Sequence, residues 1–233
     1  EMAYPYASEP GLAKHCGDLP FATGAAVWGT GINPGFVMDL LPIFMTASME
    51  HVEKIEVTRV NSLSPFGKTV MEEQGVGLTL EEFKEKRKQN ELAGHVGFKE
   101  SVYMIGKALN IEIEQFHQAM EPIVTNVDRI SPHGKALRGT VAGINMTCEA
   151  TVNGKTFIIM KHPQQIEPQA EGIDTGDYVT LHGSPEITLK IKPEIEGGIG
   201  TVAMCVNSIL NVIEAGSGLK TMINLPVPRA LLN

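Results

Sequence analysis

The sequence predicts an α+β fold with one open, mixed and mostly antiparallel β-sheet and helices packed on one face. Three observations predict it. Segments that alternate between apolar and polar residues concentrate between residues 141 and 191. Segments with helical periodicity come before and after them. The regular strand–helix alternation of a parallel sheet is missing, and so is any internal repeat. The chain therefore groups its helices around a sheet instead of alternating them with strands.

The first part of the chain is expected to lead into this sheet. Residues 1–24 predict an irregular leading segment with a short helix near residues 8–15, for which Ser8 supplies the N-cap. Residues 25–28 form a short apolar strand before a glycine-rich turn. Asn33 followed by Pro34 suits an N-cap and first helical position, so a helix is expected to begin there. Pro42 should kink that helix.

The middle of the chain predicts one strand and three helices. Residues 52–61 alternate so that Ile55, Val57, Arg59 and Asn61 share one face of a strand. Thr79 and the glutamate three residues later form a capping box, which begins a helix that runs to about residue 90. Two further helices are expected over residues 98–109 and 113–120.

The second half is expected to supply most of the sheet. Strands over residues 141–152 and 156–162 are joined by Asn153-Gly154, which is a strong hairpin signal. Two more strands, over residues 178–182 and 187–191, follow in sequence. An apolar helix over residues 201–213 and an extended tail end the chain.

Composition excludes several classes of function. The net charge is −8, and the densest basic run, residues 84–88, is interrupted by Glu85 on a predicted helix, which disfavours nucleic-acid binding. Cys16, Cys148 and Cys205 are far apart and form no C-x-x-C motif, so neither a disulfide framework nor a metal site is expected. No signal peptide and no apolar run of membrane-spanning length is recognised, which predicts a reduced, cytoplasmic protein that does not contact membranes.

The glycine-rich turn over residues 29–35 departs from a dinucleotide-binding motif. Its spacing is G-x-G-x-x-x-G, and Pro34 removes one amide donor. No strand with an acidic end follows about 20 residues later, where a ribose partner is required. The turn is better interpreted as an elbow that holds Asn33 at the rim of a cleft.

Polar residues replace apolar ones at one end of two predicted strands. Arg59 and Asn61 continue an apolar face, and such residues are costly to bury unless they meet a ligand or a protein partner. A structural salt bridge is the alternative. His162 repeats the pattern on its own strand, and His95 lies between two glycines before a helix. For both histidines, a satisfied core residue is the alternative to a functional one.

Several motifs in the same order resemble the 2,4-diaminopentanoate dehydrogenases and related NAD(P)-dependent amine dehydrogenases. These enzymes share their architecture with dihydrodipicolinate reductase. The resemblance covers essentially the whole chain. It is carried by the segments 29–36, 64–67, 74–77, 94–98, 162–165, 176–178, 192–201 and 225–229.

The resemblance implies a domain organisation. A nucleotide-binding Rossmann domain would precede this chain and would bind NAD or NADP. Residues 1–24 would then follow that domain, residues 25–196 would form a substrate-binding and dimerisation domain, and residues 197–233 would form a C-terminal helix and tail. The chain alone is expected to be inactive and to form a homodimer through the sheet.

The resemblance also implies the site residues. Glu1 matches the glutamate that accepts a proton from the substrate amine, although a residue directly upstream is an alternative. Arg59 could hold the carboxylate of a diamino acid. A phenylalanine occupies position 66, where some relatives have tyrosine, and the missing hydroxyl is expected to alter substrate preference. The implied substrate-binding residues are Asn33, Phe36, Arg59, Asn61, Phe66, His95 and His162.

The implied activity is oxidative deamination, or reductive amination in reverse, of 2,4-diaminopentanoate or a related amine. Two alternatives stay open. The chain could be a catalytically silent assembly or ligand-binding module. It could also belong to an imine reductase like dihydrodipicolinate reductase, although the basic residues that would grip a dicarboxylate are not evident.

Overall fold

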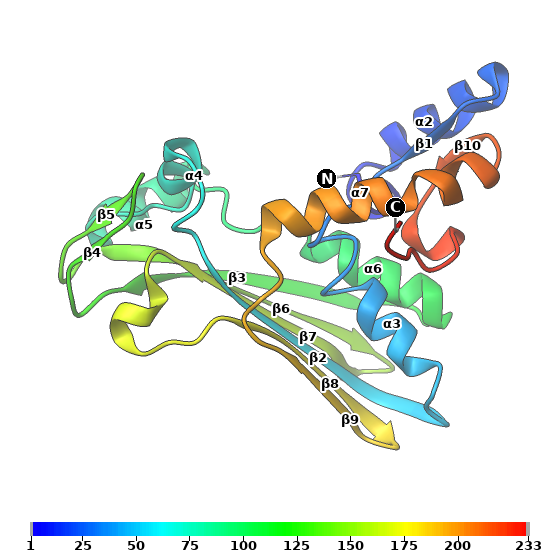
Figure 1. The fold of residues 1–233 in the computed structure, drawn as a ribbon. Helices are drawn as coiled ribbons and strands as arrows, with labels where there is room; N and C mark the ends of the chain where they lie inside the picture. Colours follow the sequence, from blue (N-terminus) through cyan, green and yellow to red (C-terminus); the bar gives the residue numbers. More distant parts are fainter. Residues whose placement is uncertain (1, 232–233) are drawn as a thin grey trace.

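A six-stranded mixed sheet forms the centre of the fold in the computed structural model, which describes residues 2–231 (Figure 1). The strand order is β3-β6-β7-β2-β8-β9, and only the β2–β7 pair among these neighbours is parallel. The strands are β2 (His51–Ser62), β3 (Gln115–Val124), β6 (Val141–Val152), β7 (Lys155–Gln165), β8 (Gly176–Ser184) and β9 (Ile187–Ile191).

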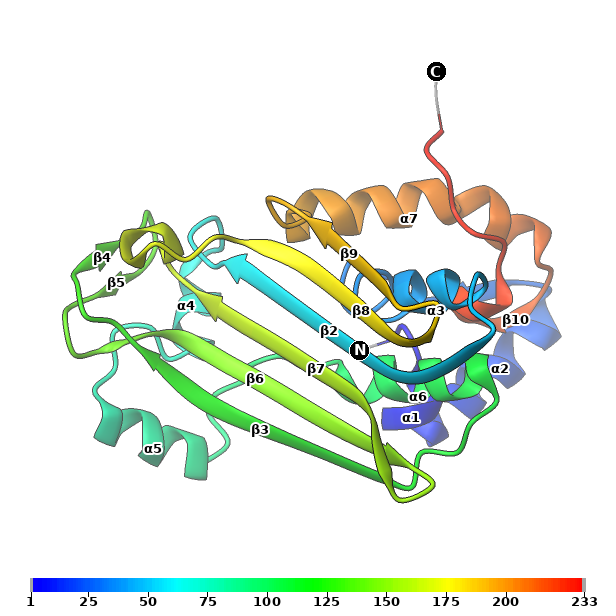
Figure 2. The same ribbon diagram turned by 90° about the horizontal axis from the view of Figure 1, so that it is seen from below.

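Helices cover one face of this sheet, and no helix within residues 2–231 covers the other (Figures 1 and 2). The helices α3 (Leu40–Thr46) and α6 (Phe98–Leu109) lie on the covered face, and α7 (Gly197–Glu214) lies on the same side. At one end of the sheet lie α4 (Lys68–Glu73), α5 (Leu80–Lys88), the small hairpin of β4 (Arg129–Ile130) and β5 (Lys135–Ala136), and the turn η1 (Pro168–Glu171). The predicted fold class is confirmed.

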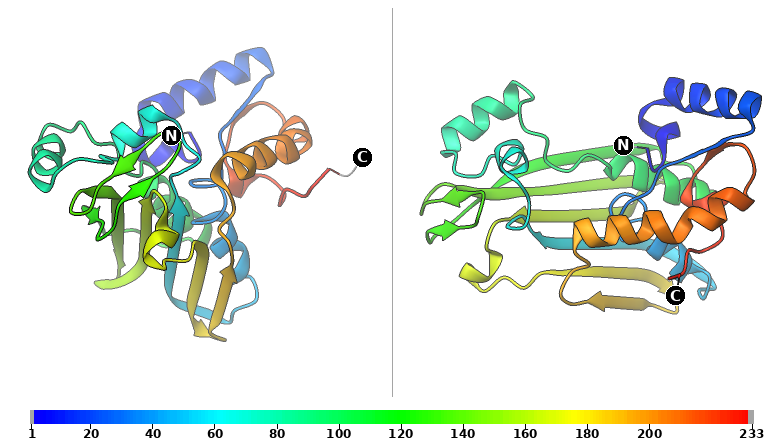
Figure 3. Two further views of the ribbon diagram at one scale, coloured as in Figure 1. Left: turned by 60° about the vertical axis from the view of Figure 1, so that its left-hand side comes forward. Right: turned by 45° about the horizontal axis from the view of Figure 1, so that its top comes forward.

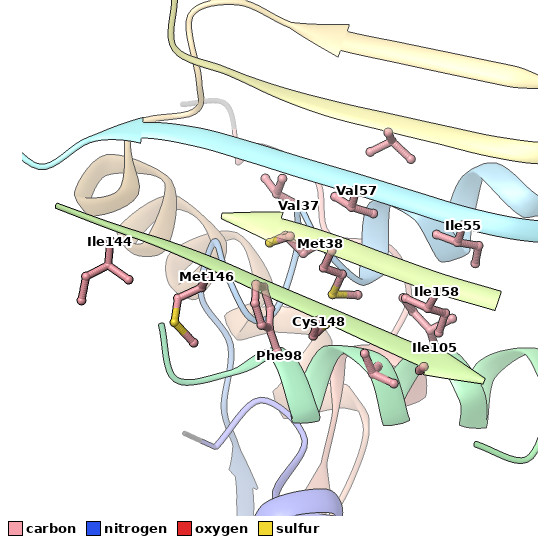
Figure 4. Packing of buried hydrophobic residues seen from close by; sticks show 14 of the residues in the cluster. Val37, Met38, Ile55, Val57, Phe98, Ile105, Ile144, Met146, Cys148 and Ile158 are labelled. Carbon is pink, nitrogen blue, oxygen red and sulfur yellow. The ribbon is translucent and has the colours of Figure 1, made fainter. Parts of the chain in front are cut away.

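The core lies between the sheet and the two covering helices. Val37, Met38, Phe98 and Ile105 point toward the sheet, where they meet residues such as Ile55 (Figure 4). The alternation along β2 places Ile55 and Val57 on this covered face, as predicted. Burial of these side chains is the main stabilising contribution that joins helices to sheet.

Several local predictions are confirmed. The hairpin between β6 and β7 turns at Asn153 and Gly154, which both have positive φ. Thr79 caps α5, and its side chain and that of Glu82 form the reciprocal capping box. The helix α6 has the predicted bounds of residues 98–109. Each of these features depends on residues that are close in sequence.

The predicted helix over residues 113–120 is wrong, because Gln115–Val124 forms the edge strand β3. Phe116 and Met120 lie opposite Ala150 and Met146 of β6 and pack against the core. Pro122 is tolerated because an edge strand leaves one side of its backbone unpaired. Pairing with a strand far along the chain therefore decided this segment.

The predicted helix start at Asn33 is also wrong. Residues 33–39 form a series of turns, with a cis peptide bond between Asn33 and Pro34, and the helix begins at Leu40 with Asp39 as its N-cap. Pro42 therefore lies in the first turn, where proline is tolerated, and it does not interrupt a longer helix. At the N-terminus, Ser8 ends α1 (Pro5–Ser8), and the N-cap of α2 (Pro10–Thr23) is Glu9.

The uncovered face of the sheet carries polar side chains. By alternation, Lys54, Glu56 and Thr58 of β2 lie on this face, next to Lys161 of β7 and Thr180 of β8. Ile55 and Val57 of the same strand lie instead on the covered face, under the helices.

The two ends of the described chain come together in a second, smaller group (Figure 3). The strand β1 (Ala26–Trp28) pairs in parallel with β10 (Gly218–Lys220), and α2 and α7 contact this pair. The short turn η2 (Met222–Asn224) follows, with Met222 accepting a hydrogen bond from the indole of Trp28. The leading and trailing segments of the sequence therefore form one structural group.

The helix α7 leaves most of its apolar surface exposed. Ile199, Val202 and Ile213 are 72%, 63% and 69% exposed. By length and composition alone, this helix could cross a membrane, which corrects the expectation that no apolar run is long enough. One such helix is weak evidence for a membrane segment.

Candidate functional site

The candidate site lies where the covered face of the sheet turns from apolar to polar. Arg59 and Asn61 of β2 and His162 of β7 are all buried there. Two loops lie over them. One is the elbow of residues 29–39, which carries Asn33, and the other is the segment of residues 92–97, which carries His95.

Four of the predicted site residues form one connected cluster. The Nε2 of His162 lies 3.0 Å from Oδ1 of Asn61, and its Nδ1 lies 3.3 Å from Nδ2 of Asn33. The ring of His95 packs edge-on against that of His162, with 4.7 Å between the ring centroids. The structure therefore brings together residues from two strands and two loops, and their role in binding a substrate stays a prediction.

Arg59 takes part in a buried ion pair. Its Nη1 donates to Oδ1 of Asp177 on β8 at 2.6 Å, and its Nη2 donates to the carbonyl of Ile195 at 2.6 Å. The side chains of Arg59 and Asp177 are only 2% and 1% exposed. The structural salt bridge left open by the sequence is thus present, and it ties the segment before α7 to the sheet. The carboxylate role for Arg59 stays a prediction.

The elbow is held in place by a buried carboxylate. Asp39 accepts hydrogen bonds from the backbone of Gly35 at 2.9 Å and Leu40 at 2.6 Å, and from the hydroxyl of Ser101 on α6 at 2.7 Å. Burial raises the pKa of Asp39, while these three hydrogen bonds oppose that rise. The contacts fix the turn that presents Asn33.

Glycine is required where the two loops approach each other. Gly97 has a φ of +147°, and a Cβ placed there would lie 2.6 Å from Cδ of Pro34. Gly35 has a φ of +127°, and its Cβ would lie 2.4 Å from the backbone nitrogen of Gly31. A side chain at Gly97 would push the elbow away from the segment that carries His95, and a side chain at Gly35 would distort the elbow itself.

Both histidines of the site are held neutral. Burial lowers the pKa of His95 to about 4, and the nearby positive charge of Arg59 adds to this effect. Burial likewise holds the pKa of His162 well below its ordinary value, with smaller contributions from His95 and Arg59. Because the charge of Arg59 is matched by that of Asp177, the cluster carries no net charge near neutral pH.

The remaining predicted residues are Phe36, Phe66 and Glu1. Phe36 is part of the elbow, is half-buried and packs against the core. Phe66 contacts the start of α7, with its Cζ 3.4 Å from the position a Cβ of Gly197 would take. Glu1 lies outside the described residues. Among residues 2–231, no group of three or more His, Cys, Asp or Glu side chains is arranged to hold a metal ion.

Three residues of the site were not predicted. Asp177 is the partner of Arg59, and Gln74 and Gln164 bring further buried amide groups. Gln164 lies two residues after His162 on the same strand, so alternation places both on one face. That spacing was a usable signal for Gln164. No local pattern marks Asp177 or Gln74, because their partners lie far along the chain.

The described residues do not form a pyrophosphate site at the glycine-rich turn. A Cβ at Gly29 would lie 2.4 Å from the carbonyl oxygen of Met2, and the space beside Gly35 is filled by the backbone of Gly31. Pro34 has no amide hydrogen to donate. The chain itself thus fills the openings that a phosphate group would need.

Comparison with known structures agrees with this architecture. The fold is similar to that of an amine dehydrogenase from Mycobacterium smegmatis, with a TM-score of 0.85 at 20% sequence identity. The match covers 99% of this chain and 68% of that one. At this identity, the likeness establishes the fold.

Sequence comparison shows the family. Residues 36–233 match the 2,4-diaminopentanoate dehydrogenase C-terminal domain, and the chain belongs to that family. A 2,4-diaminopentanoate dehydrogenase of Acetoanaerobium sticklandii is 55% identical over all 233 residues. An amine dehydrogenase of Streptomyces virginiae is 22% identical over 228 residues. The chain spans 66% and 62% of the lengths of these two relatives.

Proposed function

We propose that this chain is the substrate-binding part of an NAD(P)-dependent amine dehydrogenase that deaminates 2,4-diaminopentanoate or a closely related amine. The observation that carries this proposal is the 55% identity, over all 233 residues, to a protein named 2,4-diaminopentanoate dehydrogenase. The smaller identity to an amine dehydrogenase supports the broader reaction class. A cytoplasmic location is proposed with it.

The uncharged character of the cluster suits an amine substrate. An amine must lose its proton before oxidation at the neighbouring carbon, and a fixed positive charge nearby would assist that loss but repel the ammonium form. His95 and His162 are neutral, and Arg59 is paired, so the cluster neither repels nor traps an ammonium group. The amide groups of Asn33 and Asn61 can orient the substrate through hydrogen bonds.

A carboxylate beside the elbow would accept the proton of the substrate ammonium group. We propose Glu1 for this role, with a residue directly upstream as the alternative. The support is the position of Met2, whose backbone lies against Gly29 at the start of the elbow. Met2 thus lies beside the first residue of the elbow that carries Asn33.

The nucleotide is proposed to bind to a part of the protein outside the described residues, since the glycine-rich turn does not fit it. The parallel pair β1–β10 supports this proposal, because a two-stranded parallel sheet is not stable alone and normally continues into a larger sheet covered on both faces. The exposed apolar side chains of α7, next to this pair, are typical of a surface that another part of the protein buries. A nucleotide-binding domain would meet both needs.

Calorimetric titration tests the proposal. The 233-residue chain should bind neither NAD nor NADP, whereas a polypeptide extended upstream to the length of the relatives should bind one of them and oxidise 2,4-diaminopentanoate. Tight binding of either nucleotide by the short chain would mean that this segment has its own nucleotide site. Failure of the extended polypeptide to oxidise any amine would overturn the proposal.

The role of Arg59 can be separated by substrate comparison. If Arg59 holds the carboxylate of a diamino acid, Arg59→Met should raise KM for amino-acid substrates far more than for simple amines. If it only anchors Asp177 and the Ile195 carbonyl, both substrate types should lose activity equally. We propose the anchoring role, because both Nη atoms already have protein acceptors.

We propose a homodimer formed through the uncovered face of the sheet. Its support is the absence of any described helix on that face (Figure 2). The polar side chains there would pack sheet against sheet by hydrogen bonds more than by apolar burial. Sedimentation analysis should give a dimer, and Thr58→Arg together with Thr180→Arg should shift it to a monomer. An unchanged mass would refute this interface.

A further inference from the structure

Buried polar atoms without a partner gather around the His162 cluster. Among the described residues, these include Oδ1 of Asn33, Oε1 of Gln74, Nε2 of His95 and Nε2 of Gln164. Most buried polar atoms in proteins have hydrogen-bond partners, because an unpaired one is costly. Several such atoms in one place therefore indicate that another molecule supplies the missing partners.

Contacts link these atoms into one site. Gln74 donates to the carbonyl of Gly94 at 2.7 Å, directly beside His95 in sequence. The ring of His95 packs on His162. Gln164 lies opposite Asn61 in the parallel pairing of β2 and β7, and both side chains are buried. Gln74 thus binds the segment that carries His95, and Gln164 lies beside Asn61, which is a partner of His162.

The hydrogen-bond chain determines which end of Asn33 is free. The carbonyl of Ser62 can only accept, so the Nδ2 of Asn61 faces it and Oδ1 of Asn61 faces His162. The Nε2 of His162 must then donate, which leaves its Nδ1 to accept from the Nδ2 of Asn33. The unpaired Oδ1 of Asn33 is therefore a hydrogen-bond acceptor.

The same reasoning applies to Gln74. The Nε2 of Gln74 donates to the carbonyl of Gly94, which can only accept. The unpaired atom of Gln74 is therefore the acceptor Oε1. Gln164 differs, because its unpaired atom is the donor Nε2. Among these three amides, the unpaired atoms are thus two acceptors, on Asn33 and Gln74, and one donor, on Gln164.

We propose that Gln74 and Gln164 are specificity residues that recognise the two ends of a diamino acid. Asn33 and Gln74 each accept a hydrogen bond from one amino group, and Gln164 donates to the carboxylate. This inference rests on the proposed amine dehydrogenase function and assigns recognition to two residues beyond those that the sequence indicated. It also explains why Arg59, with both Nη atoms already paired, is not needed to hold the carboxylate.

Substrate analogues test each contact in the complete polypeptide that carries this chain. Pentane-2,4-diamine lacks the carboxylate, and 2-aminopentanoate and 4-aminopentanoate each lack one amino group. Gln164→Met should lower kcat/KM for 2,4-diaminopentanoate at least about tenfold but leave that for pentane-2,4-diamine within about threefold. Gln74→Met should lower kcat/KM for the diamino acid by a similar factor. It should change kcat/KM little for the monoamino analogue that lacks the amino group bound by Gln74.

The controls separate recognition from folding. Gln169→Met removes an exposed glutamine of η1 and should leave every substrate ratio unchanged. If Gln74→Met does not fold, Gln164→Met and the unmodified enzyme provide the test. The kcat/KM of the unmodified enzyme must be at least about tenfold higher for 2,4-diaminopentanoate than for each analogue. Equal losses on all substrates, or no discrimination by the unmodified enzyme, would overturn this proposal alone. Absence of oxidation of every amine would overturn the proposed function and this inference with it.

Discussion

Acid should destabilise this domain through the buried histidines of the site. His95 is buried between Phe98 and His162, with a pKa of about 4 instead of its ordinary 6.5. In the unfolded chain, the same histidine binds a proton once the pH falls below about 6.5. Between these two values, the unfolded state binds more protons than the folded state. Stability must therefore decrease as the pH falls through this window.

The magnitude follows from the difference in pKa. Each pH unit corresponds to about 1.4 kcal/mol for one proton, so His95 should cost roughly 3 kcal/mol over its whole window. Between pH 7 and about pH 4.5, this contribution is about 2.5 kcal/mol. His162 adds to the loss in the same direction, because burial lowers its pKa too.

Urea unfolding followed by circular dichroism measures this effect. His95→Gln keeps a hydrogen-bonding side chain but cannot titrate, so its stability should fall about 2.5 kcal/mol less than that of the unmodified chain between pH 7 and about 4.5. His133→Gln, which removes an exposed histidine of the β4–β5 turn, should leave the pH dependence unchanged. Identical pH dependence in the unmodified chain and His95→Gln would refute the claim that His95 is buried in its neutral form.

Three further predictions concern other parts of the structure. Gly35→Ala should destabilise the domain by about 2 kcal/mol or more in urea unfolding, because φ is positive and the new Cβ would meet the backbone of Gly31. Gly139→Ala, where φ is positive but the space is open, should cost only about 1 kcal/mol. Equal costs would contradict the elbow geometry. Asp177→Asn should cost about 3 kcal/mol or more, since it leaves a buried guanidinium without its counter-charge, and a cost below about 1 kcal/mol would show that the pair is not buried. In thiol labelling of the folded chain, Cys205 on the exposed side of α7 should react quickly and Cys148, whose pKa burial raises to about 12, should react only after unfolding. Rapid labelling of Cys148 would mean that the core under β6 opens.

Interactions between near neighbours were determined by the sequence itself. The Asn153-Gly154 turn and the capping box at Thr79 need only residues within a few positions, so their patterns predicted them correctly. Alternation along β2 and β7 also placed Asn61 and His162 on the covered face, because a strand turns its side chains to opposite faces in strict order. The polar end of the sheet was therefore visible in the sequence.

Contacts between distant residues were decided only by the tertiary structure. Arg59 and Asp177 are 118 positions apart, so no local pattern could show that the guanidinium is already paired. Residues 113–120 have helical spacing, yet pairing with β6 makes them a strand, because ladder hydrogen bonds and core contacts outweigh weak helical propensity. The free ends of Asn33 and Gln74 are likewise acceptors only because carbonyl groups elsewhere in the fold fix the orientation of each amide. The sequence thus placed Asn61 and His162 on the covered face, and the fold determined which polar atoms of the site remain without a protein partner.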